Sequence, residues 1–340
     1  MEIYKKSVSR EGSLIGFQAW IEGDETDLEN CLGSSFKKHY FVNNEGLITL
    51  FYEEKEGDDF YKKLSEEILK EGFLDPLITN FISYVKKGRE LFEREASKQK
   101  IIDLYQLTIQ CWPAVTIFDE LSKSQELLEK NIGVLDKLLK VRKEYGEFMY
   151  EVEKVISDSI IKIYPQIDGF QNFITIEEFT NGKFPEKEEL EKRKKYYVLN
   201  KYNLEINKSF SEIAEEYNFK IEEKNSGKTE KEVKGMIAMR GKAIGRVKIL
   251  YKTEDINKIE AGDILIAPMT TPDHIIAMDK ASAFVTDEGG IACHAAIIAR
   301  EFGKPCIVGT DNATKVFKDN DLVFVNADEG TVKIFKSSLL

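Results

Sequence analysis

The spacing of apolar residues predicts helices through most of residues 56–221. Apolar side chains recur at every third or fourth position from Leu128 to Leu139, and again from Tyr145 to Ile156. This spacing places them on one face of a helix, with Lys and Glu on the other face. Pro165 ends the second stretch because proline cannot continue a helix. We therefore expect residues 56–221 to form a helical domain.

Three shorter signals refine this helical region. The longest apolar-looking run, Ile101 to Phe118, is interrupted by polar residues, so it predicts a buried helix rather than a membrane span. Thr175 is placed to cap a short helix together with Glu178, three residues further on. A further amphipathic helical run covers residues 186–198.

The pattern differs on either side of the helical region. In residues 1–55, the β-rich runs Tyr40–Val42 and Leu47–Tyr52 flank a turn-forming segment and predict a β-hairpin. Residues 222–234 are polar, contain a Ser-Gly pair and lack apolar periodicity, so they predict a linker. In residues 235–340 short strand-like runs alternate with short helical runs, which predicts an α/β domain. The expected strands are Val247–Leu250, Ile264–Ala267, Ala283–Val285, Cys306–Val308, Leu322–Val325 and Thr331–Phe335.

Composition narrows the classes of function. The net charge of −11 disfavours nucleic-acid binding, which requires a basic surface. The four cysteines form no CxxC pair, and the three histidines show no zinc-ligand spacing, so we expect no metal site and cysteines that stay reduced in the cytoplasm. The N-terminal segment lacks the apolar core of a signal peptide. These features predict a cytoplasmic protein that binds neither nucleic acid nor membrane.

The segment from Thr286 to Gly309 carries the chemistry. Gly289 and Gly290 allow a sharp turn after a buried strand, and His294 then stands at the start of a strongly helix-forming run. The imidazole is therefore expected at a helix N-terminus, beside unpaired backbone N–H groups. That position lowers the pKa of the imidazole and also binds anions, a combination that suits a histidine which takes up and releases a phosphoryl group.

The same segment is similar to the mobile phosphohistidine domain of the PEP-utilising enzymes, which include phosphoenolpyruvate synthase, pyruvate phosphate dikinase and the rifampin phosphotransferases. The likeness is nearly continuous over the domain of residues 235–340, and Gly235, Gly241 and Gly245 to Val247 resemble the family's entry strands. The residues that carry it in the central motif are Thr286, Asp287, Gly289, Gly290, His294, Ala295, Ala296, Ile297, Ala299, Arg300, Glu301, Gly303, Pro305, Val308 and Gly309. Upstream, the resemblance rests on Gly262 to Ala267 and on the threonine-rich loop Thr270 to Asp273.

The resemblance implies roles for individual residues. His294 would be the phosphorylated residue. The hydroxyls of Thr270 and Thr271 and the backbone N–H groups of Gly289 and Gly290 would surround the phosphoryl group.

Two further positions of the motif receive a structural or docking role. Arg300 lies nearly two helical turns beyond His294, which argues against direct phosphate contact unless its side chain reaches back. Cys293 lacks the orienting partners that thiol catalysis needs. Ala292 stands where dikinases and synthases often carry a regulatory threonine, so we expect that control to be absent.

The resemblance also implies a fold and a reaction. The expected class is α+β and multidomain, with a mostly helical N-terminal region followed by a C-terminal swivelling β/β/α phosphohistidine domain in residues 235–340. We expect no ATP-grasp domain before the carrier and no phosphoenolpyruvate-binding barrel after it. The expectation is therefore a phosphotransferase component that binds no cofactor directly. A separate ATP-grasp partner would supply ATP and Mg²⁺ chemistry, or phosphoenolpyruvate would be the donor, and the helical domain would bind a small-molecule acceptor or a partner.

Other interpretations remain open at this stage. The carrier fold could serve a non-catalytic interaction or ligand-sensing protein. A carrier fed by phosphoenolpyruvate, as in the first enzyme of the sugar-transport phosphorelay, is disfavoured because that branch generally has threonine at the position of Ala295. His274 is expected to be a surface or capping residue, and His39 has no chemical neighbours in the sequence. Trp20 and Trp112 are expected to pack in a core.

Overall fold

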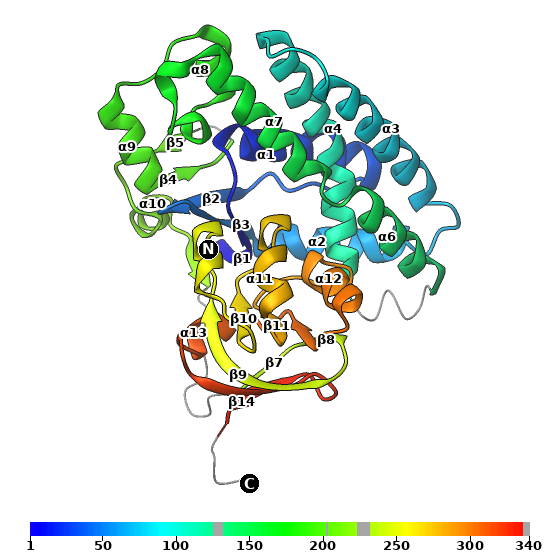
Figure 1. Ribbon diagram of the computed structural model, residues 1–340. Coiled ribbons are helices and arrows are strands. Elements are labelled where there is room, and N and C mark those ends of the chain that lie inside the picture. The colour runs from blue at the N-terminus through cyan, green and yellow to red at the C-terminus, as the bar shows by residue number, and fades with distance from the viewer. Residues whose placement is uncertain (125–131, 202, 223–231, 336–340) are drawn as a thin grey trace. The chain divides into compact units, whose positions relative to one another are not determined.

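The computed structural model describes the whole chain except residues 125–131, 202, 223–231 and 336–340 (Figure 1). The chain divides into two compact units. Unit 1 comprises Met1–Phe118 and Tyr145–Glu223, and unit 2 comprises Asp119–Glu144 and Lys224–Leu340. Each unit is described by itself below.

The described residues of unit 1 form a six-stranded sheet in the order β5-β4-β2-β3-β1-β6. The predicted hairpin is confirmed, because β2 and β3 pair antiparallel and Asn43 Oδ1 accepts a hydrogen bond from Gly46 N at 2.9 Å in the turn. The flanking strand β1 was not predicted from the sequence. The strands are β1 (Ile3–Arg10), β2 (His39–Asn44), β3 (Leu47–Glu53), β4 (Tyr196–Leu199), β5 (Leu204–Glu205) and β6 (Lys220–Glu222).

Helices make up most of the rest of unit 1, as the apolar spacing predicted. The predicted buried helix is confirmed within α4, and the Thr175–Glu178 capping box is present at the start of α8. The amphipathic run 186–198 is helical only to Lys195, because Tyr196 begins β4. The helices are α1 (Leu14–Leu32), α2 (Glu54–Glu67), α3 (Leu74–Phe92), α4 (Lys98–Lys123, whose residues from Asp119 onward belong to unit 2), α7 (Phe148–Ile163), α8 (Ile176–Asn181), α9 (Lys187–Lys195) and α10 (Phe210–Glu216), with 3-10 turns η1 (Pro165–Ile167) and η2 (Gln171–Phe173).

Pro113 lies inside α4 rather than at its end. Proline has no N–H group, so the carbonyl of Ile109, one turn earlier, lacks its usual helical partner. Gly23 of α1 lies against this carbonyl, and a Cβ added there would come within 2.6 Å of the Ile109 oxygen. Trp112 is buried and stacks on Trp20, with ring centroids 4.1 Å apart. The two tryptophans therefore pack in the interior of unit 1.

The described residues of unit 2 contain an eight-stranded sheet in the order β7-β14-β13-β9-β10-β11-β12-β8. Strands β9 to β12 run parallel, and the outer strands are antiparallel. All six predicted strands are present, although β9 begins earlier than expected. The strands are β7 (Glu232–Lys234), β8 (Met236–Met239), β9 (Lys242–Ile249), β10 (Ile264–Ala267), β11 (Ala283–Thr286), β12 (Cys306–Val308), β13 (Leu322–Asn326) and β14 (Thr331–Ile334).

The two faces of the parallel strands bury different partners. On β10, Leu265 and Ala267 pack into a core with residues of α11 and α12. Ile264 and Ile266 point to the opposite face, because side chains alternate along a strand, and pack with residues of β13, β14 and β7. Unit 2 therefore has the layered β/β/α arrangement that was expected, as Figure 1 shows.

The remaining elements of unit 2 are short apart from α6. They are α6 (Ile132–Tyr145, whose last residue belongs to unit 1), α11 (Ile275–Lys280), α12 (His294–Phe302) and α13 (Ala313–Val316), with 3-10 turns η3 (Thr253–Lys258) and η4 (Pro272–His274). The helical run expected from Leu128 to Leu139 is confirmed from Ile132 onward, whereas Leu128 lies outside the described residues.

The linker expected at residues 222–234 falls mostly outside the described residues. Its last three residues form β7, an outer strand of the unit 2 sheet. Val233 of β7 is buried in the unit 2 core. The described end of this segment is therefore part of the unit 2 sheet.

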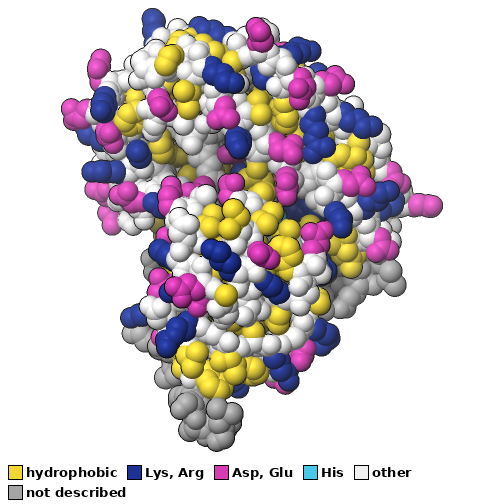
Figure 2. Space-filling view, in the orientation of Figure 1, with side chains coloured by type: hydrophobic (Ala, Val, Ile, Leu, Met, Phe, Trp, Pro, Cys, Tyr) yellow, Lys and Arg dark blue, Asp and Glu magenta, His cyan; other side chains and the backbone are white. Residues whose placement is uncertain are grey.

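Acidic and basic side chains are interspersed over the face drawn in Figure 2, with no large single-sign patch on it. Among the described helices, none combines the length and the apolar character that crossing a bilayer requires.

Candidate functional site

His294 occupies the first position of helix α12, as its place in the sequence predicted. Strand β11 ends at Thr286, and residues 287–293 connect it to the helix. Gly289 in this connection has φ +103°, a backbone conformation that favours glycine. A Cβ at Gly289 would come within 2.9 Å of the Cys293 sulfur. The predicted glycine turn is therefore needed to bring the chain back to the helix start.

One ring nitrogen of His294 is held by a threonine. Thr270 lies just beyond the end of β10 and is buried, and its Oγ1 is 2.9 Å from His294 Nδ1. In the tautomer with the proton on Nδ1, this nitrogen donates to Thr270 and the lone pair stays on Nε2. Nε2 is buried and has no hydrogen-bond partner among the described residues. The arrangement thus leaves Nε2 as the nitrogen available for chemistry.

The surroundings keep the His294 ring uncharged. Burial, followed by the nearby His274 and Arg142, lowers the pKa of His294 to about 4. Desolvation disfavours the imidazolium, and the Arg142 guanidinium repels it. At neutral pH the ring is therefore a neutral imidazole, which is the nucleophilic form.

Thr271 and His274 form a second pair beside His294. The backbone N–H of Thr271 donates to His274 Nδ1 at 3.0 Å, so the proton of a neutral His274 sits on Nε2. Both His274 Nε2 and Thr271 Oγ1 are buried and unpartnered within the described part of the chain. The Nε2–H of His274 and the hydroxyl of Thr271 are therefore available as hydrogen-bonding groups in the interior near His294.

His274 was predicted to be a surface or capping residue, and the structure corrects half of this prediction. The capping role is confirmed, because His274 bonds back to Thr271 across η4. The surface placement is wrong, since the side chain is only 3% exposed. Burial lowers the pKa of His274 as well. The signal available in the sequence was its place three residues after Thr271, in a loop that follows a buried strand.

Gly290 does not face open space in this structure. A Cβ there would collide with the backbone carbonyl of Ser122, at the end of α4, within the same unit 2. The next residue, Ile291, donates its N–H to Ser122 O at 3.1 Å. The loop before His294 is therefore in backbone contact with residues 119–123, and the predicted phosphate contact of the Gly290 N–H stays a prediction.

Arg300 and Cys293 both lie close to the loop that precedes His294. Arg300 Nη2 donates to Ile291 O at 2.7 Å, so the side chain reaches back along α12 and holds the loop. Cys293 is buried, and burial raises the pKa of its thiol. A raised pKa keeps the sulfur protonated, which argues against a thiolate nucleophile.

Sequence reasoning missed Arg142, which approaches the same loop from α6. Its Nε donates to Ala292 O at 3.3 Å, and its Nη2 pairs with Asp119 Oδ1 at 3.1 Å. Nothing in the spacing of α6 distinguishes this arginine from the other basic residues of the helix. Its proximity to His294 is a tertiary contact between segments far apart in the sequence.

Comparison with known proteins agrees with this site. Residues 259–330 match the PEP-utilising enzyme mobile domain. His294, Thr270 and the glycine turn all lie within this matched region. The motif-based resemblance to that family is therefore confirmed.

Two curated relatives show how far the likeness extends. A probable phosphoenolpyruvate synthase of Methanothermobacter thermautotrophicus is 53% identical over 100 residues, which are 29% of this chain and 15% of that protein. A probable phosphoenolpyruvate synthase of Archaeoglobus fulgidus is 45% identical over 143 residues, which are 42% of this chain and 18% of that protein. The matches thus span less than a fifth of either relative. They support a phosphohistidine carrier domain in the C-terminal part of the chain.

Among solved structures, an Enzyme I (nEIt) solution structure aligns with 99% of this chain and 87% of its own, at 16% identity and a TM-score of 0.27. A TM-score this low carries no argument about shared architecture. The mobile-domain match therefore rests on sequence.

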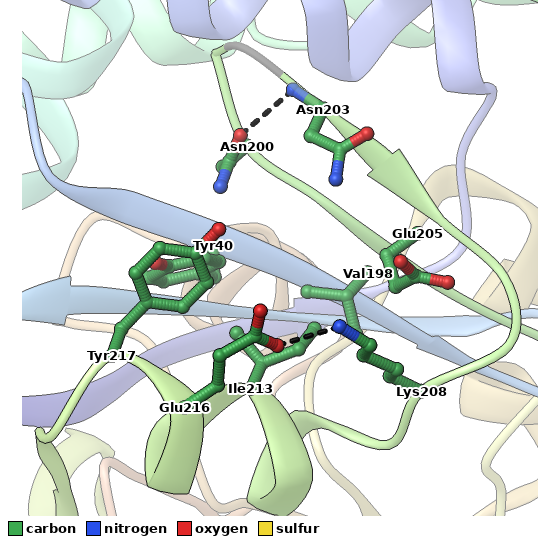
Figure 3. Close-up of a pocket in the computed structure, with 9 residues that line it drawn as sticks. All are labelled: Tyr40, Val198, Asn200, Asn203, Glu205, Lys208, Ile213, Glu216 and Tyr217. Carbon is green, nitrogen blue, oxygen red and sulfur yellow. Dashed lines mark hydrogen bonds and ion pairs between the residues drawn. The ribbon is translucent and has the colours of Figure 1, made fainter.

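The described residues hold no cluster of three or more His, Cys, Asp or Glu side chains that could bind a metal ion. Within unit 1, a small polar pocket lies between α10 and the strands β2, β4 and β5 (Figure 3). Lys208 and Glu216 pair at 2.6 Å on its lining, and Asn203 N donates to Asn200 Oδ1 at 2.9 Å. These polar groups already satisfy one another, so the pocket offers no chemistry that matches the carrier.

Proposed function

We propose that His294 carries a phosphoryl group on Nε2 between a donor and an acceptor. The observation that carries this proposal is the hydrogen bond between Thr270 Oγ1 and His294 Nδ1, at 2.9 Å. When Nδ1 carries the proton and donates it to Thr270, the lone pair lies on Nε2, at the N-terminus of a nine-residue helix. A pKa of about 4 keeps this nitrogen unprotonated at neutral pH.

The transfer has two balanced steps. In the first, the Nε2 lone pair attacks the phosphorus of the donor, the bond from phosphorus to the leaving oxygen breaks, and its electron pair departs with that oxygen. The ring then carries a positive charge, which Nδ1–H shares with Thr270 Oγ1 by hydrogen bonding. In the second, an acceptor oxygen attacks the phosphorus, the P–Nε2 bond breaks, and its electrons return to the ring.

The phosphoryl group needs surroundings that offset its negative charge. The N-terminus of α12 supplies backbone N–H groups and the positive end of the helix dipole. The hydroxyl of Thr271 and Nε2–H of His274 are buried nearby without partners among the described residues. We assign these groups, with the Gly289 N–H, to the phosphoryl oxygens.

The donor is proposed to be a separate ATP-grasp protein acting with ATP and Mg²⁺, or phosphoenolpyruvate. This follows from the curated relatives, which are named phosphoenolpyruvate synthases and exceed the matched region several-fold in length. Magnesium would arrive with the nucleotide on the partner. The acceptor is proposed to be a small molecule or partner bound by the helical part of unit 1.

The proposal is tested by labelling. The protein is incubated with radiolabelled ATP or phosphoenolpyruvate, with and without an extract of its native cells, and compared with His294→Ala. The expected result is label that is stable to base, labile to acid and absent from the variant. Absence of label from the native chain under every condition would contradict phosphotransfer.

A non-catalytic role is the second candidate, and one observation favours it. His294 Nε2 is buried in the described arrangement, so a donor reaches it only after the loop and its neighbours separate. If the carrier fold instead serves an interaction, His294→Ala would leave partner binding intact. Partner capture with the native chain and with His294→Ala, followed by the labelling assay on both, separates phosphotransfer from a non-catalytic interaction.

A further inference from the structure

The end of α4 (residues 119–123) and helix α6 contact the mobile domain although they are more than a hundred positions away in the sequence, and residues 119–144 belong to the same compact unit as that domain. Ile291 N donates to Ser122 O at 3.1 Å. Lys143 of α6 pairs with Glu301 of α12 at 3.0 Å. These contacts place the end of α4 and the C-terminal half of α6 beside the loop that precedes His294 and the helix that follows it.

Arg142 is the residue of this segment that points to the loop. Its side chain is 19% exposed, and its Nε donates to the carbonyl of Ala292, two residues before His294. Its Nη2 pairs with Asp119, which also pairs with Lys123 at 2.9 Å. Within the described part of the chain, Nη1 makes no hydrogen bond, so the guanidinium keeps donors for another anion.

We propose that Arg142 is a positioning residue for the phosphoryl group on His294, and that the end of α4 (residues 119–123) and the C-terminal half of α6 form the surface that recognises the phosphorylated carrier. This inference rests on the proposed function. A guanidinium binds two phosphoryl oxygens at once, and its planar geometry suits that contact. When Arg142 turns toward the phosphoryl group, Asp119 keeps Lys123 as its ion-pair partner.

The other groups near His294 do not replace this charge. His274, from η4, is neutral, because burial lowers its pKa. Cys293 is protonated, because burial raises its pKa. Asp119 is acidic and pairs with Arg142 itself. Arg300 of α12 donates to Ile291 O, one residue further from His294, so Arg142 is the cation that contacts Ala292 from α6.

The test uses phosphoramidate, a small donor that needs no partner protein. Nε2 attacks its phosphorus, the P–N bond breaks, and ammonia leaves. The full-length chain, Arg142→Gln, Arg142→Lys and the control Lys140→Gln are labelled, and the phosphoryl group is titrated by ³¹P NMR. Lys140 lies on α6 and is exposed, so its variant removes the same charge from the same helix.

We expect Arg142→Gln to raise the midpoint of the phosphoryl titration by about one pH unit, since a neighbouring cation favours the dianion. In Arg142→Lys the midpoint should return part of the way to the native value, and in Lys140→Gln it should equal the native value. Equal midpoints in the native chain and Arg142→Gln would overturn the proposal.

The neighbouring residues Gly289 and Gly290 allow a second test that leaves Arg142 unchanged. A Cβ at Gly290 meets only backbone atoms of Ser122 and Lys123 among its nearest neighbours, so Gly290→Ala pushes the end of α4 away from the loop. A Cβ at Gly289 meets Cys293 within the mobile domain itself. Gly290→Ala should therefore accept label and shift its midpoint as Arg142→Gln does. A labelled Gly290→Ala with the native midpoint would contradict the inference.

Failure of this inference differs from failure of the proposed function. Absence of label in the native chain overturns both. Normal labelling with unchanged midpoints in Arg142→Gln and Gly290→Ala overturns only the role of Arg142. The unlabelled imidazole of His294 gives an independent readout, because its NMR titration midpoint should rise in Arg142→Gln if the guanidinium lies beside the ring.

Discussion

At the scale of single residues, the chemistry of His294 depends on the different surroundings of its two ring nitrogens. Nδ1 is held by Thr270 Oγ1 at 2.9 Å, and Nε2 is left without a partner among the described residues. A helix N-terminus alone contributes about 0.3–1 kcal/mol against the imidazolium. Burial is the larger cause of the lowered pKa. The residue is thus prepared as a neutral nucleophile mainly by its desolvation.

The burial of His294 predicts how the protonation of its ring and the stability of the fold depend on pH. The pKa of His294 is lowered to about 4, whereas an unfolded chain titrates near its ordinary value of about 6.5. NMR titration of the ring should therefore give a midpoint close to 4. The stability that His294 contributes should be complete above about pH 6.5 and should fall as the pH drops toward 4, because only the unfolded chain then binds the proton. A midpoint near 6.5 would show that the ring is solvated.

The threonine contact predicts the effect of Thr270→Val. The variant keeps the shape of the side chain and removes the hydrogen bond to Nδ1, so the Nε2 lone pair is no longer favoured. Labelling by phosphoramidate should slow by about 2- to 10-fold, which corresponds to one hydrogen bond of about 0.5–1.5 kcal/mol. Thr310→Val is the matched control, because Thr310 is buried and donates to Thr286 O rather than to His294. Equal rates in the two variants would rule out an orienting role for Thr270.

The sequence predicted these residues unequally. The glycine turn and the helix-forming run after His294 are local signals, and they located the histidine correctly at the start of α12. The contacts of His274 and Arg142 depend on tertiary packing. Arg142 in particular meets Ala292 across 150 positions of sequence, and no local pattern encodes such a contact.

At the scale of elements, short apolar runs proved the most predictable feature. Strands β10, β11 and β12 of unit 2 are buried on both faces, so they appear as continuous apolar runs bounded by turns. Residues 196–198 were harder to assign, because Tyr196–Val198 continue an amphipathic helical pattern. Pairing of β4 with β2 decides their conformation, and this pairing is again non-local.

A buried ion pair joins two elements of unit 1 and supports a stability prediction. Arg10, at the end of β1, pairs with Glu153 of α7 at 3.0 Å, and its guanidinium lies over the Tyr150 ring at 4.8 Å. Arg10→Ala leaves the Glu153 carboxylate buried without its cation, which should destabilise the fold by about 3 kcal/mol. The decrease in the free energy of unfolding is measured by urea denaturation.

The same pair predicts how that loss varies with pH. Burial already raises the pKa of Glu153, and Arg10 opposes the rise. Without Arg10 the pKa rises further, so the destabilisation should shrink as the pH falls and Glu153 takes up a proton. The double variant Arg10→Met with Glu153→Leu should be more stable than Arg10→Ala, because it leaves no unpaired charge. A loss that is the same at all pH values would exclude this explanation.

At the scale of the whole molecule, the chain combines a mobile domain with a helical and sheet-containing unit. The mobile-domain match begins at residue 259 and ends at residue 330, so it covers neither unit 1 nor residues 119–144. The grouping of residues 119–144 with the mobile domain was not foreseen, because apolar spacing predicts that a helix forms and not which surface it packs against. The layered order of unit 2, in contrast, followed from the motif.

The central claim is that Nε2 of His294 accepts a phosphoryl group. Its most direct test is to label the full chain with phosphoramidate and to locate the phosphate by mass spectrometry and by ³¹P–¹⁵N correlation. The account predicts a single phosphate on His294, bonded to Nε2 and absent from His294→Ala. Phosphate bonded to Nδ1, phosphate on another residue, or no phosphate at His294 would contradict it.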